Sequence, residues 1–186
     1  MINEILYPPG VQVPVTYDYS YLNKFTDTYL DWKNWSIDLE RDFQRLKCRT
    51  SLNSFKSVFT DSLPRYSCKF SIRILRGSNF KIGISESTNC CENAFSDLPG
   101  GMAFYSMAQL RNGSASQGKH YGTPYRANDL VTVYVDRQLG CVFFAVNDAM
   151  FEKAFEIDGD RDYYGAVACL TKGEWFEMVQ PEMEDW

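Results

Sequence analysis

The sequence is poor in the residues and runs that mark several common classes of protein. Histidine occurs once in 186 residues, and no Cys-x-x-Cys pair is present, so a recognisable zinc ligand set is lacking. No apolar run approaches the roughly 20 residues that cross a bilayer. The opening stretch, MINEILYPPG, has neither the basic flank nor the apolar core of a signal peptide. We therefore expect an intracellular, cytoplasmic protein that does not insert into membranes.

Basic residues are in the minority as well. The chain has 19 lysines and arginines against 24 aspartates and glutamates, with a formal net charge of −5 and a pI near 4.9. A nucleic-acid-binding protein presents a basic face to phosphates, so we expect no nucleic-acid partner. Aromatic residues make up 16% of the chain, which indicates a globular protein. The length suits one domain with a sizeable core plus an extension.

Catalytic motifs are absent too: there is no P-loop, no GxSxG, no HExxH, and no GxGxxG after a strand. The lone His120 has no ordered partner in the sequence, which favours a structural role over that of a base. The acidic run IDGDRD (157–162) resembles part of a calcium loop, but the glutamate and flanking helices of such a loop are missing. Nothing selects a carboxylate pair for glycoside hydrolysis, because distance in space defines such a pair. We predict a protein that is not an enzyme and binds no metal or cofactor.

Six cysteines are present, but their surroundings argue against disulfides. Cys68, Cys141 and Cys169 fall in apolar, strand-like runs, and Cys90 and Cys91 are adjacent in a loop-like stretch. A thiol in an apolar run of an intracellular protein behaves as a small hydrophobic residue. We therefore interpret these residues, together with Cys48 in RLKCRTS, as free thiols.

The first 46 residues form a predicted extension with one or two short helices. Prolines and a glycine make residues 1–16 extended and irregular. Asp18 can cap a helix over residues 18–32, and a stripe at helical spacing follows it: Leu22, Phe25, Tyr29 and Trp32. This stripe packs either on the chain's own domain or on a partner chain. The stretch LERDFQRLK (39–47) can form a second short helix, but its pattern is ambiguous.

From residue 47 to about residue 180 the pattern is one of strands and turns. YSCKFSIRIL (66–75) and LVTVYVD (130–136) alternate apolar and polar residues with period two. Further strand-like runs, separated by turns rich in glycine, occur at 80–85, 101–110, 141–146, 163–170 and 175–180. Short strands without intervening helices predict an all-β fold, a two-sheet antiparallel sandwich. Residues 181–186 form an acidic tail.

One stretch resembles a known family. NDLVTVYVDRQLGCVFFAVNDAMFEKAFE (128–156) is similar to the SPRY/B30.2 signature. In that signature an alternating strand ends in aspartate, a short turn with glycine follows, and the next strand has the pattern L-x-F-x-x-N-G. The matching residues are Asp136, Gly140, Phe143 and Asn147. Residues 66–75, 80–85 and 162–179 resemble other strands of the family in the correct order, so the likeness covers about residues 48–180. Phe80 stands where the family has tryptophan, and Asp148 where it has glycine, which indicates a divergent member.

The resemblance implies a concanavalin-like sandwich that serves as a non-catalytic recognition module. Its loops at one end of the sandwich would bind a partner protein or peptide, as loops on a rigid scaffold commonly do. Aromatic residues and arginine dominate interface energetics, and glycines let a ligand backbone approach. The candidate partner-binding residues are Gly100, Gly101, Met102, Arg111, His120, Tyr121, Gly173 and Trp175.

We expect an adaptor or structural subunit of a larger intracellular assembly, because the aromatic extension and the acidic tail resemble arms that dock on neighbours. The alternative is a carbohydrate-binding, lectin-like sandwich, which shares the architecture. Trp175, Asn147 and His120 could supply its aromatic platform and polar groups.

Overall fold

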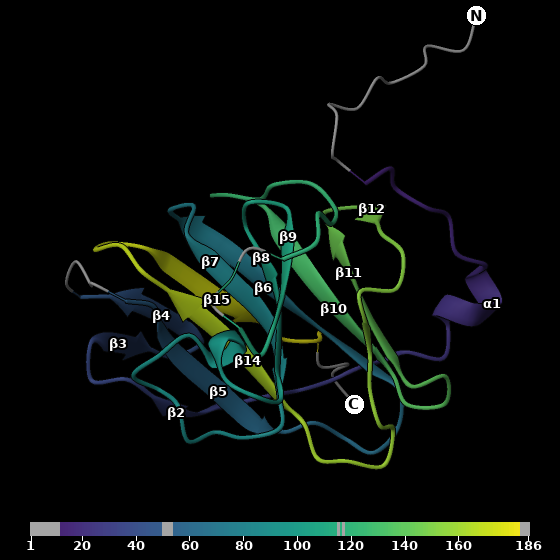
Figure 1. Cartoon of the computed structure of the whole chain (residues 1–186), viewed down its shortest axis with the longest axis horizontal. Coiled ribbons are helices and arrows are strands. Elements are labelled where there is room, and N and C mark those ends of the chain that lie inside the picture. The colour runs from purple at the N-terminus through teal and green to yellow at the C-terminus, as the bar shows by residue number, and fades with distance from the viewer. Residues whose placement is uncertain (1–11, 50–53, 115, 117, 183–186) are drawn as a thin grey trace, which may run out of the picture.

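Two sheets packed face to face make up almost all of the structure (Figure 1). This computed structural model describes residues 12–49, 54–114, 116 and 118–182. Sheet A runs, in spatial order, β12 (Ala149–Met150), β11 (Cys141–Val146), β10 (Leu130–Asp136), β6 (Cys68–Arg76), β15 (Trp175–Val179), β4 (Arg45–Cys48), β3 (Leu39–Asp42). Sheet B runs β2 (Trp32–Trp35), β5 (Lys56–Ser62), β14 (Tyr164–Cys169), β7 (Phe80–Ser85), β8 (Gly101–Tyr105), β9 (Gln109–Asn112).

Four short elements complete the fold. β13 (Phe155–Glu156) pairs with β11, and β1 (Thr26–Asp27) pairs with β6 in parallel, whereas the other strand pairs are antiparallel. One turn of helix, α1 (Tyr19–Leu22), precedes β1, and a 3₁₀ turn, η1 (Phe95–Asp97), precedes β8. The predicted all-β sandwich is confirmed.

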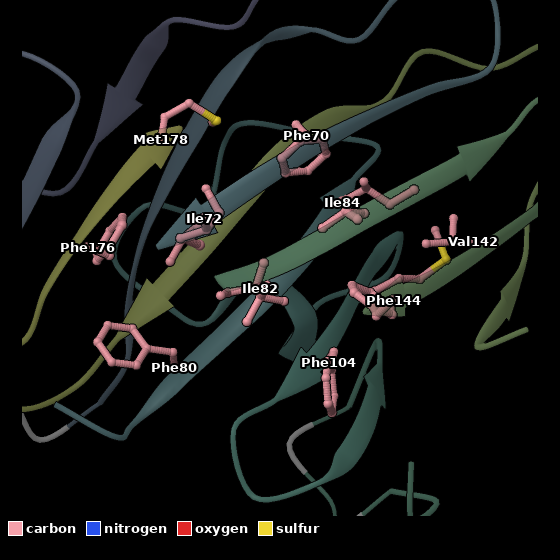
Figure 2. Close-up of a cluster of buried hydrophobic side chains, with 14 of the residues drawn as sticks. Phe70, Ile72, Phe80, Ile82, Ile84, Phe104, Val142, Phe144, Phe176 and Met178 are labelled. Carbon is pink, nitrogen blue, oxygen red and sulfur yellow. The ribbon is translucent and has the colours of Figure 1, made fainter. Parts of the chain in front are cut away.

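The core lies between the sheets and follows from the period-two alternation. In β6, Cys68, Phe70, Ile72 and Ile74 are buried, while the residues between them are half-buried. Figure 2 shows side chains from β6, β15 and β11 of sheet A filling the same space as Phe80, Ile82 and Ile84 of β7 in sheet B. Each buried side chain of this size stabilises the fold by about 1.5–3 kcal/mol, so alternation alone dictates which face of each strand packs inward.

The β10–β11 hairpin has the predicted register, with Asp136 opposite Cys141. The Asp136 Oδ1 accepts hydrogen bonds from the backbone N–H groups of Gln138 and Leu139 at 3.0 and 2.9 Å. Gly140 has a φ of +65°, which a residue without Cβ adopts most readily. At the other end of β11, Asn147 with φ +54° makes the next turn. The turn therefore forms even though Asp148 stands where the SPRY pattern has glycine.

The predicted helix over residues 18–32 is wrong beyond its first turn. Asp18 does cap α1, accepting from the Ser20 backbone N–H at 2.8 Å, but the helix ends at Leu22. The chain then runs extended as β1 beside β6, crosses between the sheets, and enters sheet B with Trp32. Pairing with existing strands outweighed a weak helical pattern, because tertiary hydrogen bonds and burial exceed helix propensity in magnitude.

The predicted second helix over 39–47 is wrong as well, and so is the boundary at residue 46. Residues 39–48 form a β3–β4 hairpin whose turn contains Phe43 with φ +51°. Since β2, β3 and β4 belong to the two sheets, the sandwich begins well before residue 47, and 46 falls inside a strand. Residues 1–11 of the predicted extension and 183–186 of the acidic tail lie outside the described residues.

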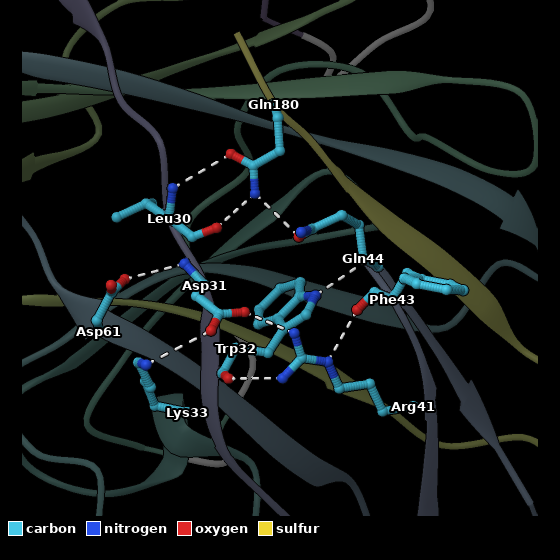
Figure 3. Close-up of polar contacts among 9 residues, drawn as sticks. All are labelled: Leu30, Asp31, Trp32, Lys33, Arg41, Phe43, Gln44, Asp61 and Gln180. Carbon is cyan, nitrogen blue, oxygen red and sulfur yellow. Dashed lines mark hydrogen bonds and ion pairs between the residues drawn. The ribbon is translucent and has the colours of Figure 1, made fainter.

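A polar network fixes the crossing segment between the sheets (Figure 3). The Arg41 guanidinium donates to the Asp31 carboxylate at 2.5 Å and to the Trp32 carbonyl at 3.0 Å. Burial opposes ionisation of Asp31, but the contact with Arg41 prevails and lowers its pKa. Gln180, just after β15, accepts from the Leu30 N–H at 3.2 Å and donates to the Leu30 carbonyl. The Asp31 N–H also donates to the Asp61 carboxylate of β5 in sheet B at 3.1 Å. The crossing segment is thus bound to both sheets.

Candidate functional site

The loops that carry the predicted partner-binding residues lie at opposite ends of the sandwich. Trp175 begins β15 and pairs with Arg76, which comes just before the start of β7. Gly101 begins β8 and pairs with Ser85, at the far end of β7. A six-residue strand is about 20 Å long, so Gly100, Gly101 and Met102 do not share a surface with Gly173 and Trp175.

The glycines at the start of β8 serve internal packing rather than ligand approach. A Cβ on Gly101 would lie 1.9 Å from the Phe95 carbonyl oxygen, so only glycine fits beside η1. Gly100 takes a φ of +84° in the turn before it, and the Met102 side chain is buried. These three residues hold η1 against β8.

Tyr121 is a core residue, which contradicts its prediction as a ligand contact. Its side chain is 1% exposed and packs edge-on against Phe104. The hydroxyl donates to the Glu152 carbonyl at 2.6 Å and accepts from the Phe144 N–H at 3.1 Å. Burial raises its pKa well above the usual value for tyrosine. A partner could reach it only after the core opened.

Arg111 and His120 lie at the edge of sheet B. Arg111 in β9 is buried, and its guanidinium carbon lies 5.3 Å from the Tyr105 ring centroid. His120 is exposed and forms an isolated bridge with Gln109. The stretch around His120 therefore covers the outer strand of sheet B, which limits unwanted pairing of an edge strand.

Trp175 remains available to a partner. It lies half-buried on the outer face of sheet A, between Lys47 of β4 and Arg76 of β6 in the strand register. The Arg45 guanidinium carbon lies 5.2 Å from its ring centroid, a cation–π contact that fixes the ring without covering it entirely. Gly173, in the turn before it, has a φ of +84°.

The residue that organises this end was missed by sequence reasoning. Glu174 is 2% exposed, and its carboxylate accepts four backbone hydrogen bonds from two loops. Oε1 accepts from Leu170 and Thr171 at 2.9 and 2.5 Å, and Oε2 accepts from Ser78 and Asn79 at 3.1 and 2.7 Å. A carboxylate with four donors is satisfied in a buried site. The signal available was its place after the glycine of the TKGE turn.

We call this end of the sandwich the Glu174 end and define it by loops 77–79, 106–108, 124–129 and 171–174. Three hollows lie on it: one of about 680 Å³ between loops 106–108 and 124–129, one of about 250 Å³ between loops 77–79 and 171–174, and one of about 390 Å³ beside β4. Neighbouring hollows share lining residues: Ser78 lines the first two, and Gly173 the last two. They form a continuous, shallow surface with Met107, 57% exposed, at one side and Trp175 near the other.

The N-terminal residues of the described chain pack on their own domain. Phe25 is buried in a cluster with Tyr134 and Phe143 on the outer face of sheet A, and Leu22 packs against it. The predicted aromatic stripe does not hold together as one face. Tyr29 is 60% exposed, while Trp32 is buried in the core against Phe176.

A buried carboxylate ties this segment to the hairpin. Asp136 accepts from the Tyr21 hydroxyl at 2.6 Å, and the Lys24 ammonium lies 2.6 Å from the same oxygen. Burial opposes ionisation of Asp136, but the Leu139 N–H, Lys24 and Tyr21 prevail and lower its pKa. An open hollow of about 650 Å³, lined by Tyr17, Tyr21, Phe143 and others, lies beside the segment.

The residues that a lectin-like site would need, Trp175, Asn147 and His120, do not lie together. Asn147 follows β11, and Trp175 begins β15, with β10 and β6 between these strands. At roughly 4.8 Å per strand, their backbones are about 14 Å apart, and His120 lies at the edge of the other sheet. The Asn147 side chain is engaged in hydrogen bonds to Leu130 and Asp129.

Among the described residues, no group of three or more His, Cys, Asp or Glu side chains is placed to hold a metal ion. The same part of the chain contains no helix long and apolar enough to cross a membrane. No disulfide joins the cysteines of this part of the chain. Cys48 and Cys169 are neighbours in the core, where their hydrogen bond and burial raise the pKa of Cys169.

Comparison with known proteins rests on the fold. No family model and no curated protein sequence matches the chain. Solved structures do match. The TRIM65 PSpry domain superposes with a TM-score of 0.65 at 14% identity, over 91% of this chain and 99% of that one. The SPRY domain of human HERC1 superposes with a TM-score of 0.61 at 12% identity, over 76% of this chain and 91% of that one. The Neuralized NHR1 domain of Drosophila melanogaster superposes with a TM-score of 0.58 at 12% identity, over 83% of this chain and 100% of that one. The chain therefore has the fold of a SPRY domain, carried by a divergent sequence.

Proposed function

We propose that the protein is a non-enzymatic interaction module that recognises a partner protein or peptide through the Glu174 end. The observation that carries this proposal is the continuity of three hollows across loops that come from both sheets. A shallow surface of this kind suits an extended peptide or a protein loop, whereas a small-molecule site is usually a deeper, enclosed pocket.

Rigid loops support this proposal. The Glu174 carboxylate fixes loops 77–79 and 171–174 through four backbone hydrogen bonds. A surface that is ordered before binding loses less conformational entropy when the partner arrives. The exposed Met107 and the half-buried Trp175 provide apolar surface at separate points of the end, and side chains of this kind commonly anchor interfaces.

We further propose that the protein works as an adaptor or structural subunit of a larger cytoplasmic assembly. The docking role first given to Leu22 and Phe25 is not part of this proposal, because both pack on their own domain. The exposed Tyr29 contacts a neighbouring subunit in this proposal, whereas the buried Trp32 is a core residue.

The test is affinity purification of the tagged full chain with mass spectrometry, comparing wild type with M107D/W175D. We expect the double variant to lose the partners that wild type retains, with little change in thermal midpoint. The matched control is L139D, because Leu139 is 68% exposed at the opposite end, in the β10–β11 turn. Retention of every partner by M107D/W175D, or loss of the same partners by L139D, would contradict the proposal.

A further inference from the structure

One part of the Glu174 end carries an excess of positive charge. The hollow beside β4, here called the basic groove, is lined by Glu40, Cys48, Gly173 and four cationic residues: Lys47, Arg49, Arg76 and Lys172. Four cations against one carboxylate leave a net of three positive charges. The chain as a whole has a formal charge of −5, so this groove opposes the charge of the rest of the molecule.

The four cations are not used to hold the fold. Within residues 12–49, 54–114, 116 and 118–182, none of them forms an ion pair, whereas Arg45 pairs with Glu177 and Arg161 with Glu86. Lys47, Arg49, Arg76 and Lys172 are exposed. An exposed cation without a carboxylate partner is accessible to an incoming anion.

The strand register gathers these charges around an aromatic ring. Lys47 and Arg76 lie opposite Trp175 on its two neighbouring strands, which places directly paired residues about 5 Å apart. A Cβ on Gly173 would lie 3.7 Å from the Arg76 guanidinium carbon, so the guanidinium lies directly against the glycine turn. Anion-binding groups and an apolar surface are therefore adjacent.

We propose that the basic groove binds an acidic peptide segment of the partner, with carboxylates beside Arg76, Lys172 and Lys47 and an apolar side chain against Trp175. This inference rests on the proposed function of the Glu174 end and adds the chemical class of its partner. Arginine suits the task because its planar guanidinium matches a carboxylate in two parallel hydrogen bonds.

Two observations favour an acidic peptide over a nucleic acid. A polyanion must follow a track of cations, but the groove is compact and the chain's net charge of −5 repels a long phosphate backbone. Single-stranded nucleic acid also needs a series of aromatic rings for stacking, whereas in the described part of the chain the strand register places a single ring, that of Trp175, between groove cations.

The test uses three fluorescein-labelled pools of short peptides that share randomised apolar positions. The remaining positions are acidic in one pool, neutral amides in the second and basic in the third. Binding to the full chain is followed by fluorescence anisotropy. Each exposed ion pair changes affinity by roughly two- to fivefold, so we expect the acidic pool to bind about tenfold more tightly than the neutral pool. The preference should shrink between about 0.05 and 0.5 M salt as charges are screened.

The variant R76E/K172E should lose this preference and bind the basic pool best. R76Q/K172Q should bind the acidic and neutral pools alike, which separates loss of attraction from new repulsion. The control K119E/K153E changes the net charge by the same amount at exposed lysines outside the groove and should keep the acidic preference. Thermal midpoints of all variants confirm that they are folded.

Each outcome decides a separate point. Equal binding of the acidic and neutral pools by wild type overturns the acidic specificity and leaves the proposed peptide-binding function standing. Binding of no pool at all counts against the proposed function itself. Loss of preference in K119E/K153E shows that overall charge, not the groove, is responsible. Tighter binding of a labelled single-stranded DNA oligonucleotide than of the acidic pool, abolished by R76E/K172E, would reassign the groove to nucleic acid.

Discussion

Replacing Glu174 by glutamine tests how the Glu174 end is held together. The substitution conserves size and shape but removes the charge and one of the two acceptor oxygens. The carboxylate uses Oε1 for the Leu170 and Thr171 N–H groups and Oε2 for those of Ser78 and Asn79. A glutamine can accept from one pair only, and its amide group presents two donors to the other pair.

The cost follows from the number of donors left without an acceptor. Two unsatisfied backbone N–H groups at roughly 1–3 kcal/mol each would cost about 2–6 kcal/mol. Because Ser78 is exposed and Asn79 half-buried, water can replace part of the lost bonding, and we expect a decrease of about 2–4 kcal/mol in the free energy of unfolding. That is a large share of the roughly 5–15 kcal/mol that stabilises a typical domain.

Urea unfolding followed by tryptophan fluorescence measures the change. Hydrogen exchange adds a local readout, since the amides of residues 78, 79, 170 and 171 should lose protection first. The control is E156Q, which removes an exposed carboxylate that forms an ion pair with Lys153 on the surface; its midpoint should match wild type. A decrease for E174Q below about 1 kcal/mol, or unchanged exchange at the four amides, would refute the account of Glu174.

Three further predictions follow from the geometry. G101A should prevent or severely weaken folding, because its Cβ would overlap a backbone oxygen at 1.9 Å. In G173A the nearest atom lies 3.7 Å from the new Cβ, so this variant should lose only about 1–2 kcal/mol through backbone strain. Thermal melts of the two variants compare the losses of stability. The pKa of Asp136 is lowered in the fold, so its ionised carboxylate stabilises the native state above the usual aspartate pKa, and this stabilisation is lost as pH falls through the native pKa. The urea midpoint of D136N should therefore fall less steeply than that of wild type between about pH 5 and 2. Burial raises the pKa of Cys68 to about 11, so a thiol reagent at neutral pH should modify the half-buried Cys90 first and Cys68 only on unfolding; equal rates in the folded protein would contradict this.

The strands of the sandwich were predictable because their information is local. In β6 and β10, each residue's face is decided by the alternation of its own neighbours, and Asp136, Gly140 and Asn147 fix the turns through their own backbone preferences. No distant contact is needed to specify such a hairpin.

The N-terminal part was mispredicted for the opposite reason. Leu22, Phe25, Tyr29 and Trp32 recur at helical spacing, yet the structure distributes them over an outer cluster, an exposed position and the core. The strands that this segment pairs with, β6 and β5, come from about 30 to 40 residues further along the chain. Local periodicity cannot encode a partner that distant.

The sequence by itself determined the class of fold, the inward face of the main strands and the register of the β10–β11 hairpin, because each depends on side chains a few residues apart. Only the tertiary structure decided which loops share an end. It separated Gly101 from Trp175, buried Tyr121 and brought Glu174 to four backbone donors. It also gathered cations from β4, β6 and the loop before β15 around one ring. A binding surface of this kind is defined by proximity in space, which sheet pairing between distant segments creates.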